Sequence, residues 1–255
     1  MSFQIIKSDP SFKRDIKIDK SIPQIKVSEF FSKTLQGEGI TAGTPAAFLR
    51  TKDCLLNCVW CDSEAVWRHG NSWSIFELLD MMEKNNLVED FKNGHHFVIT
   101  GGSPLKQQKG LASLLAMFQM RYQFIPYIEV ENECVAEIQP YFAQFVSQWN
   151  NSPKLSNCGM KRAIYHKPDI IKQASQMNNS WFKIVVDNEN DWNEIKTDFL
   201  DTELIRREQL ILMPCGQNEN ELKDKRQMVA EIAIRENVLF SDRLHITLWN
   251  EKTGV

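Results

Sequence analysis

Cys54-Leu-Leu-Asn-Cys58-Val-Trp-Cys61 follows an apolar run at residues 46–50. Cysteines separated by three and then two residues can place three thiolates on one loop around a single metal centre. Iron–sulfur clusters usually take four cysteine ligands, so three would leave one iron open to a substrate or cofactor. We therefore predict a [4Fe-4S] cluster held by Cys54, Cys58 and Cys61.

A zinc site completed by a histidine or a distant cysteine is the other interpretation of this loop. Zinc modules usually supply paired ligands, and no second CxxC and no HxxxH occurs in the chain. We expect the three scattered cysteines, Cys134, Cys158 and Cys215, to be small buried side chains rather than ligands.

The pattern around the cysteines indicates an α/β fold. Apolar, β-rich runs recur at residues 46–50, 97–100, 127–130, 181–186, 210–213 and 244–249, and residues 24–30 and 143–149 are weaker candidates. Helical periodicity lies between most of them, at residues 75–86, 110–120, 169–177, 191–200 and 219–235. Ser74 and Glu77 have the spacing of a capping box. Alternating strands and helices predict a parallel sheet with right-handed crossovers.

About six βα units could form a full barrel, an incomplete barrel or an open doubly wound sheet, and spacing alone does not choose among them. In each arrangement the reactive groups should collect at the carboxyl ends of the strands. A chain of 255 residues fits one domain. We expect residues 1–24 to be an N-terminal extension and residues 25–255 to be that domain.

Composition narrows the class of protein. The chain is 42% hydrophobic and 25% charged, with a net charge of -3, so no overall field attracts nucleic acid or an anionic membrane. No apolar run approaches the roughly 20 residues of a membrane helix, and the N-terminus lacks the pattern of a signal peptide. We expect a cytoplasmic protein with neither a nucleic acid nor a membrane as its partner.

The residues that flank the cysteines resemble those of the 7-carboxy-7-deazaguanine synthase family, a branch of the radical S-adenosylmethionine superfamily. The resemblance covers about residues 25–255, and it implies a single-domain incomplete (β/α) barrel of about six parallel strands. The shared motifs, in order, are Gln36-Gly37-Glu38-Gly39; Gly43, Pro45, Phe48 and Arg50; the three cysteines and Asp62-Ser63; Thr100-Gly101-Gly102-Ser103-Pro104-Leu105; Ser152-Pro153-Lys154; Phe182-Lys183-Ile184-Val185-Val186-Asp187; Met213-Pro214; and Arg243-Leu244-His245-Ile246 through Leu248-Trp249 to Gly254-Val255.

The resemblance implies contraction of 6-carboxy-5,6,7,8-tetrahydropterin to 7-carboxy-7-deazaguanine, with loss of ammonia, in the synthesis of queuosine and related deazapurines. In this family the open iron binds S-adenosylmethionine, whose cleavage yields a 5′-deoxyadenosyl radical. An electron donor such as flavodoxin, Mg²⁺ and a homodimer are further expectations. The alternatives are an activase that places a glycyl radical on a partner protein and a zinc-binding module without catalysis.

Site residues follow from the same resemblance. Arg50 suits a carboxylate because its guanidinium can form a bidentate pair. Ser63 would bind Mg²⁺ through its hydroxyl, unless it only caps a helix. The expected substrate residues are Leu35, Gln36, Gly37, Glu38, Arg50, Thr100, His245 and Val255, with a core histidine as the rival role for His245. The expected cofactor residues are Trp60, Cys61, Asp62, Gly102, Ser103, Ser152, Pro153, Lys154, Met213, Pro214, Cys215 and Gly216.

Two positions depart from the family. Where Ser103 stands the family usually has a glutamate, whose carboxylate supports the methionine ammonium of the cofactor. A serine brings no charge, so we expect weaker cofactor binding unless another carboxylate, such as Glu129 or Glu131, takes this role. Glu129-Val130-Glu131-Asn132 also follows the family's Glu-Thr-Asn-Gly only loosely.

Overall fold

The computed structural model describes residues 3–14, 19 and 21–254, which form one α/β domain built on a ten-stranded sheet. The sheet order is β1-β2-β3-β5-β6-β7-β8-β9-β10, and β4 pairs with β2. The strands from β3 to β10 along this path are parallel, whereas β1, β3 and β4 each run antiparallel to β2. The strands are β1 (Phe3–Ile6), β2 (Gln24–Leu35), β3 (Pro45–Thr51), β4 (Asn71–Ser74), β5 (His96–Gly101), β6 (Ile128–Asn132), β7 (Gln148–Asn151), β8 (Ser180–Val186), β9 (Leu210–Pro214) and β10 (Leu239–Phe240).

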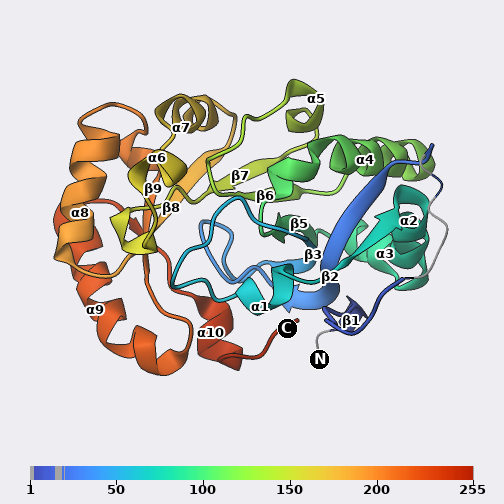
Figure 1. Ribbon diagram of the computed structural model, residues 1–255, viewed down its shortest axis with the longest axis horizontal. Helices are drawn as coiled ribbons and strands as arrows, with labels where there is room; N and C mark the ends of the chain where they lie inside the picture. Colours follow the sequence, from blue (N-terminus) through green and yellow to red (C-terminus); the bar gives the residue numbers. More distant parts are fainter. Residues whose placement is uncertain (1–2, 15–18, 20, 255) are drawn as a thin grey trace.

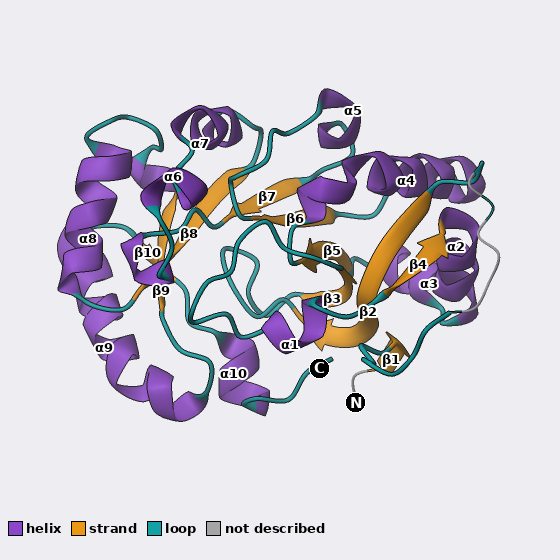
Figure 2. Ribbon diagram, in the orientation of Figure 1, coloured by secondary structure: helices purple, strands orange, loops and turns teal. Residues whose placement is uncertain are grey.

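Helices cover the outer side of this sheet, so that the strands lie inside an arc of helices (Figure 1; Figure 2). The helices are α1 (Glu64–Trp67), α2 (Ile75–Lys84), α3 (Leu87–Lys92), α4 (Gln108–Tyr122), α5 (Pro140–Ala143), α6 (Arg162–Tyr165), α7 (Pro168–Ser175), α8 (Glu189–Ile195), α9 (Glu219–Glu236) and α10 (Leu244–Trp249). Short helical turns are η1 (Pro104–Gln107), η2 (Ser156–Cys158), η3 (Lys196–Leu200) and η4 (Arg207–Gln209).

The two faces of the sheet differ in chemistry because side chains alternate along each strand. In β6, Ile128 and Val130 pack into the main core, while Glu129 and Glu131 point to the opposite, inner face. In β8, Phe182 and Ile184 join the same core, and Lys183 lies on the inner side. Apolar side chains therefore hold the helices on the outside, and charged side chains line the inside.

Most predicted elements are confirmed with small shifts at their ends. The runs at residues 46–50, 97–100, 127–130, 181–186 and 210–213 correspond to β3, β5, β6, β8 and β9, and residues 24–30 begin the longer β2. The five predicted helices correspond to α2, α4, α7, α8 with η3, and α9. The Ser74–Glu77 capping box is present at the start of α2. The candidate at residues 143–149 overlaps only the beginning of β7.

The predicted strand at residues 244–249 is wrong, because these residues form α10. A short apolar run does not distinguish a strand from a buried helix. Contacts far along the chain fix the helix here: the Leu244 backbone nitrogen donates to the Gly37 carbonyl at 2.8 Å. Arg243, just before it, is buried in ion pairs with Glu38 and Asp62.

The expectation of about six strands is also corrected, since the sheet has ten. The additional strands are β1, β4 and β10, which are two to four residues long, together with β2 and β7. Along the described part of the chain β1 and β10 end the pairing order, and the predicted barrel is not confirmed.

The segment before residue 25 contacts the domain at several places. β1 pairs with β2, with Phe3 opposite Ser32. The Arg14 guanidinium lies 3.7 Å from the centre of the Trp73 ring and binds the Glu77 carboxylate at 2.6 Å. The predicted domain boundary at residue 24 stays a prediction.

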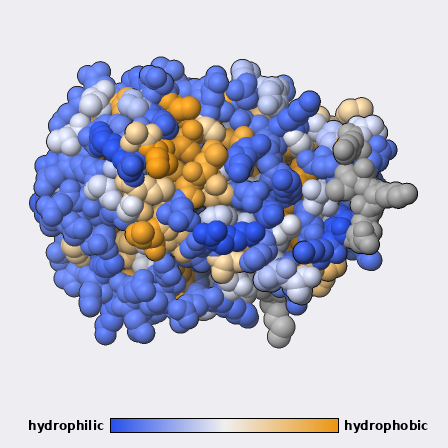
Figure 3. All heavy atoms as spheres, in the orientation of Figure 1, coloured by the Kyte–Doolittle hydropathy of each residue, from blue (hydrophilic) through white to orange (hydrophobic). Residues whose placement is uncertain are grey.

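The face presented in Figure 1 carries apolar side chains gathered near its centre, with polar side chains around them (Figure 3). Two exposed apolar residues, Leu55 and Val59, belong to the cysteine loop at residues 52–63.

Among the described residues, no helix combines the length and the apolar character needed to cross a bilayer.

Candidate functional site

A cavity of about 280 Å³ opens at the carboxyl ends of the parallel strands, as the fold class predicted. It brings together most of the site residues expected from the sequence, although they come from segments more than 200 residues apart. The expected residues that line it are Leu35, Gln36, Gly37, Glu38, Arg50, Cys54, Cys58, Trp60, Cys61, Asp62, Ser63, Thr100, Gly102, Ser152, Lys154, Met213 and His245.

Several expected residues do not line this cavity. Ser103 is fully buried behind it, with 0% of its surface exposed. Val255 lies outside the described residues, although residues 250–254 line the cavity. The other expected cofactor residues absent from the lining are Pro153, Pro214, Cys215 and Gly216.

Hydrogen bonds to the backbone and to the cysteine sulfurs fix the cysteine loop at residues 52–63. Asp53 has a φ of 68°, and its nitrogen donates to the Trp67 carbonyl at 3.1 Å. Cys54 Sγ accepts a hydrogen bond from the Leu56 nitrogen at 3.3 Å, and Cys61 Sγ accepts one from Trp67 Nε1 at 3.4 Å. These hydrogen bonds hold the two sulfur atoms in place on the loop.

The scattered cysteines are buried, as expected. Cys134 and Cys158 are 0% exposed and Cys215 is 5% exposed. Cys158 packs beside Cys58, an expected ligand, and the Cys158 carbonyl accepts a hydrogen bond from the Val59 nitrogen at 3.1 Å. The Cys158 side chain and burial together raise the pKa of the Cys58 thiol.

The spacing of the cysteine sulfurs argues against a single zinc ion. Zn–S bonds of about 2.3 Å require the ligand atoms to converge tightly. Across the described parts of the chain, the one group with three ligand atoms within 4.8 Å of one another is Glu38, Asp62 and His245. The three cysteine sulfurs do not converge in this way, and three thiolates on one loop that lines a cavity fit a cubane cluster.

Gly102 allows the end of β5 to contact the cysteine loop directly. A Cβ at this position would lie within 2.6 Å of the Cys54 backbone nitrogen and closer still to the Asp53 carbonyl. Real Cβ atoms do not approach backbone that closely, so only glycine fits without moving the loop. The Gly102 nitrogen also donates to the Thr51 carbonyl at 3.2 Å, which aligns the two strand ends.

Arg50 is held by a buried carboxylate that the sequence analysis missed. Glu29 lies opposite Arg50 in the β2–β3 register, and its Oε1 accepts from Arg50 Nε at 2.8 Å. Glu29 is 2% exposed, whereas the Arg50 side chain is 17% exposed and lines the cavity. Because Glu29 binds Nε, the two terminal nitrogens of the guanidinium are left as a fork for a carboxylate.

Glu38 is the centre of a buried network of charges. Lys183 Nζ binds it at 2.6 Å and also binds Glu131 at 2.5 Å, while Arg243 Nε binds it at 3.0 Å. Arg243 also binds Asp62 and the Gly216 carbonyl. Burial opposes ionisation of Glu38, but Lys183 and Arg243 outweigh it and hold its pKa well below the ordinary value.

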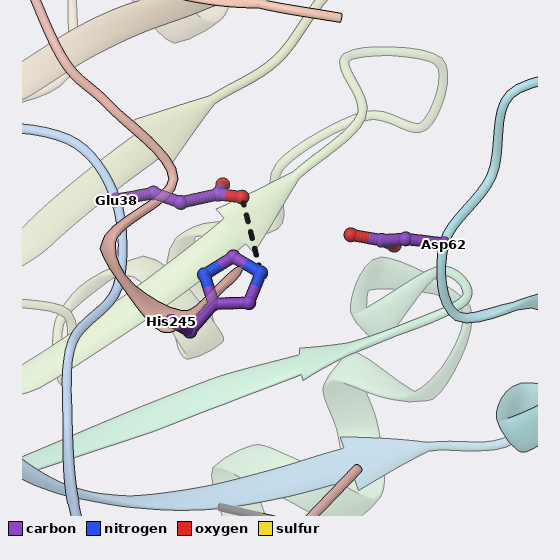
Figure 4. A group of neighbouring side chains, drawn as sticks. All are labelled: Glu38, Asp62 and His245. Carbon is purple, nitrogen blue, oxygen red and sulfur yellow. Dashed lines mark ion pairs between the residues drawn. The ribbon is translucent and has the colours of Figure 1, made fainter. Parts of the chain in front are cut away.

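His245 lies beside this network, with Nε2 3.9 Å from a Glu38 oxygen, and Asp62 approaches from the other side (Figure 4). Burial lowers the pKa of His245, which favours the neutral imidazole. The imidazole packs so closely on Gly37 that a Cβ there would collide with the ring. Arg243 already balances the two carboxylates, so Glu38, Asp62 and His245 do not require a metal ion.

The Gln36 side chain joins the turn after β2 to two carboxylates of β6. Its Nε2 donates to Glu129 at 2.9 Å and to Glu131 at 3.2 Å, and its Oε1 accepts from the Glu38 nitrogen at 3.3 Å. Glu129 is itself 0% exposed and binds His96 at 2.5 Å. Burial opposes its ionisation, but hydrogen bonds from its neighbours lower the pKa of Glu129.

Ser63 occupies the first position before α1, yet its side chain makes no capping hydrogen bond. Its hydroxyl lies 3.8 Å from Cys61 Sγ and faces the cavity. The capping alternative therefore loses its main support, and the hydroxyl is available to a ligand.

Several lining residues were not predicted as site residues: Glu29, Glu131, Glu133, Lys183 and Arg243. A signal for two of them was present, because a charged residue inside an apolar strand, such as Glu29 or Lys183, is rarely buried without a partner. Glu131 and Arg243 bind partners on distant segments, which leave no local pattern, and Glu133 has no hydrogen-bond partner among the described residues.

Comparisons with known proteins agree with this geometry. A family model described as a 4Fe-4S single cluster domain matches residues 35–139. A 7-carboxy-7-deazaguanine synthase of Pyrobaculum aerophilum is 31% identical over 235 residues, which cover 91% of this chain and 98% of the relative. One of Halobacterium salinarum is 27% identical over 247 residues, which cover 90% and 92%. The crystal structure of QueE from Escherichia coli has a similar fold, with a TM-score of 0.64 at 22% identity, covering 87% of this chain and 95% of that one.

The contact at Gly102 gives a first test. Gly102→Ala should push the Asp53–Cys54 backbone away from β5 and lower the iron bound after reconstitution by more than half, because misplaced ligands lose the cluster. The measurement is iron per chain by chemical assay. Gly94→Ala is the control: it has a φ of 92° but nothing within 4 Å of the added Cβ, so it should lose some stability and keep its iron. Equal iron in both variants would contradict the assignment of this contact.

Proposed function

Since the chain belongs to the 7-carboxy-7-deazaguanine synthase family, we propose that it contracts the ring of 6-carboxy-5,6,7,8-tetrahydropterin to 7-carboxy-7-deazaguanine, with loss of ammonia. The observation that carries this proposal is that Arg50 and the three cysteines line one cavity. A group that binds a carboxylate and a loop that binds a cluster are thus placed to act on the same molecule.

Cys54, Cys58 and Cys61 would hold a [4Fe-4S] cluster, and Trp60, Asp62, Ser152, Lys154 and Met213 would surround S-adenosylmethionine beside it. When bound, this pair supplies a 5′-deoxyadenosyl radical that removes hydrogen from the substrate. The chain's own task is to aim one carbon–hydrogen bond and to exclude water. The Lys154 ammonium is 5.5 Å from the centre of the Trp60 ring, so the two stiffen the wall of this pocket.

Arg50 would position the substrate. Its free fork matches a carboxylate, and Glu29 prevents the guanidinium from turning away. Glu38, His245, Leu35, Thr100 and the Gln36–Gly37 turn would meet the edges of the pterin ring, and residues 250–254 cover the same cavity. Because Lys183 and Arg243 keep Glu38 ionised, this carboxylate accepts hydrogen bonds from the amino and ring N–H groups of a pterin.

Mg²⁺ would bind the Ser63 hydroxyl together with oxygen atoms of the substrate and water, because this ion prefers oxygen ligands and keeps several waters. The proposal also includes a cytoplasmic location, a homodimer, and a one-electron donor such as flavodoxin. The exposed apolar side chains of Leu55 and Val59, 43% and 72% exposed beside the cluster ligands, support contact with a protein partner. The product would serve queuosine and related deazapurines.

The cysteines give the test of cofactor chemistry. Reconstituted protein should hold about four iron atoms per chain. Alanine at Cys54, Cys58 or Cys61 should lower iron content and abolish reductive cleavage of S-adenosylmethionine, measured as 5′-deoxyadenosine released. Cys134→Ala is the matched control, because Cys134 is buried in the main core and should cost only stability. Cofactor cleavage by the triple alanine variant would refute the proposal.

Arg50 gives the test of substrate identity. Arg50→Ala should raise KM for the carboxypterin by about tenfold or more, because it removes a charge-assisted pair, and should lower kcat through misalignment. Arg50→Lys should fall between the two, since lysine keeps the charge and loses the fork. Glu29→Gln should shift both constants in the same direction but less. Steady-state kinetics with product identified by mass spectrometry measures these effects.

The control for this test is a pterin without the carboxylate. Wild type should bind it poorly, and Arg50→Ala should bind it no worse than wild type does. Arg121→Ala, at an exposed arginine paired with Asp80 and Glu83, should change neither constant. If Arg50→Ala weakens both ligands equally, Arg50 has a structural role and the substrate assignment fails.

Ser63 gives the test of the magnesium role. Turnover should rise with Mg²⁺, Ser63→Ala should lose most of that dependence, and Ser63→Thr should keep it because the oxygen is retained. The measurement is the product rate over a Mg²⁺ titration, with Ser113→Ala on the outer helix α4 as the control. A magnesium response that survives in Ser63→Ala would remove Ser63 from the site.

A further inference from the structure

The Ser103 hydroxyl is already committed to the cysteine loop. It accepts a hydrogen bond from the Leu55 nitrogen at 2.7 Å, and it donates toward Cys54 Sγ at 3.6 Å. A hydroxyl has one proton to donate, so this donor is used. Ser103 therefore fixes the position of Cys54 and does not supply the negative charge that a ligand ammonium would need.

A carboxylate that lacks a hydrogen-bond partner lies next to Ser103. Glu133 follows β6, is 6% exposed, and lines the cavity beside Cys54 and Lys154. Neither of its carboxylate oxygens has a hydrogen-bond partner in the part of the chain that the structure describes. Burial is the main cause that raises the pKa of Glu133, and the nearby Ser103, Lys154 and Lys106 side chains oppose it only in part. A cation bound beside this carboxylate would offset the cost of its buried charge.

The other two carboxylates of this strand are already satisfied. Glu131 binds Lys183 at 2.5 Å, and Glu129 binds His96, Gln36 and Thr41. Both point to the inner face of the sheet, and Glu131, although it lines the cavity, is held by Lys183. Neither can therefore take the role that the sequence analysis offered to them.

The backbone after β6 holds Glu133 in place. Asn132 Oδ1 accepts a hydrogen bond from the Cys134 nitrogen at 3.0 Å, and Asn132 Nδ2 donates to Asn151 at 2.8 Å. Cys134 has a φ of 61°, in the left-handed region that favours glycine. The family's Glu-Thr-Asn-Gly motif ends in glycine, and the left-handed backbone at Cys134 matches that last position. The motif therefore corresponds to residues 131–134 rather than 129–132, and Glu133 occupies its third position.

We propose that Glu133 is the carboxylate that binds the ammonium of the methionine part of S-adenosylmethionine, in place of an acidic residue at Ser103. The inference rests on the proposed function, because it assumes that this cofactor binds over the cysteine loop. The cofactor carries one primary ammonium group, and Glu133 presents two unpartnered oxygens beside Cys54. The acidic residue would thus lie after β6 rather than after β5, and the cavity would still carry a negative charge at this place.

Binding of S-adenosylmethionine to the anaerobic, cluster-loaded protein without a reductant tests this inference. Glu133→Gln should weaken binding by at least about tenfold, since a charge-assisted hydrogen bond is lost. The matched control is Glu137→Gln, an exposed glutamate four residues further on, which should bind as wild type does. A cofactor analogue whose amino group is replaced by hydrogen should bind wild type weakly and Glu133→Gln no worse.

A charge exchange gives the sharper comparison. Ser103→Glu alone should weaken binding, because it places two buried carboxylates side by side and removes the hydroxyl that holds the Leu55 nitrogen. Ser103→Glu combined with Glu133→Asn should recover at least part of the affinity lost in Glu133→Asn. Thermal unfolding of the metal-free protein supplies a readout that needs no ligand: Glu133→Gln should raise Tm by about 2 °C or more, because an unpartnered buried charge is removed.

The outcomes separate the inference from the proposed function. If cluster-loaded wild type does not bind S-adenosylmethionine at all, both fail. If wild type binds and Glu133→Gln binds equally well, the inference alone fails. Tighter binding by Glu133→Gln would also overturn it, by showing that the carboxylate competes with the cofactor for the open iron.

Discussion

The Arg243 guanidinium binds Glu38, Asp62 and the Gly216 carbonyl together, and the shape of the site depends on this contact. It joins the turn after β2, the cysteine loop, the end of β9 and the start of α10. A buried guanidinium is stable only when its donors are satisfied, and removing one partner of such a pair typically costs about 3–5 kcal/mol. The C-terminal helix is therefore held over the cavity by charge more than by apolar packing, since Ile246 is its one buried residue.

The buried charges on the inner face of the sheet are likewise paired with charges of opposite sign. Glu131, Lys183, Glu38, Arg243 and Asp62 alternate in sign and form a continuous row of contacts from β6 to the cysteine loop. Because each charge is balanced by its neighbours, the row can be buried without a large loss of stability. Its rigidity would suit the proposed reaction, in which a flat polar heterocycle is held in one orientation beside a radical source.

Local patterns predicted the outer layer well and the inner layer poorly. The apolar strands, the helices and the Ser74–Glu77 capping box depend on neighbours in sequence, so periodicity found them. The edge strands β1, β4 and β10 are too short to show a pattern, and α10 forms because Gly37 and Glu38 lie beside it. At the site, motif resemblance identified Arg50, but its partner Glu29 became evident only from the β2–β3 register. Glu133 became a candidate only because neither of its carboxylate oxygens has a hydrogen-bond partner among the described residues.

Glu133 is the exception to the pairing of charges around the cavity. Around the cavity, Glu29, Glu38 and Asp62 each have a basic partner from this chain, and they would be stable with no ligand bound. Within the described ranges Glu133 has no such partner, although Lys154 lies near enough to lower its pKa. Lys154 instead donates to the Ser152 hydroxyl and carbonyl at 2.8 Å, and so keeps the wall closed without quenching the carboxylate. Because this nearby lysine is bonded to Ser152, the Glu133 carboxylate is left for the ligand ammonium proposed above, and we expect the free protein to be less stable as a result.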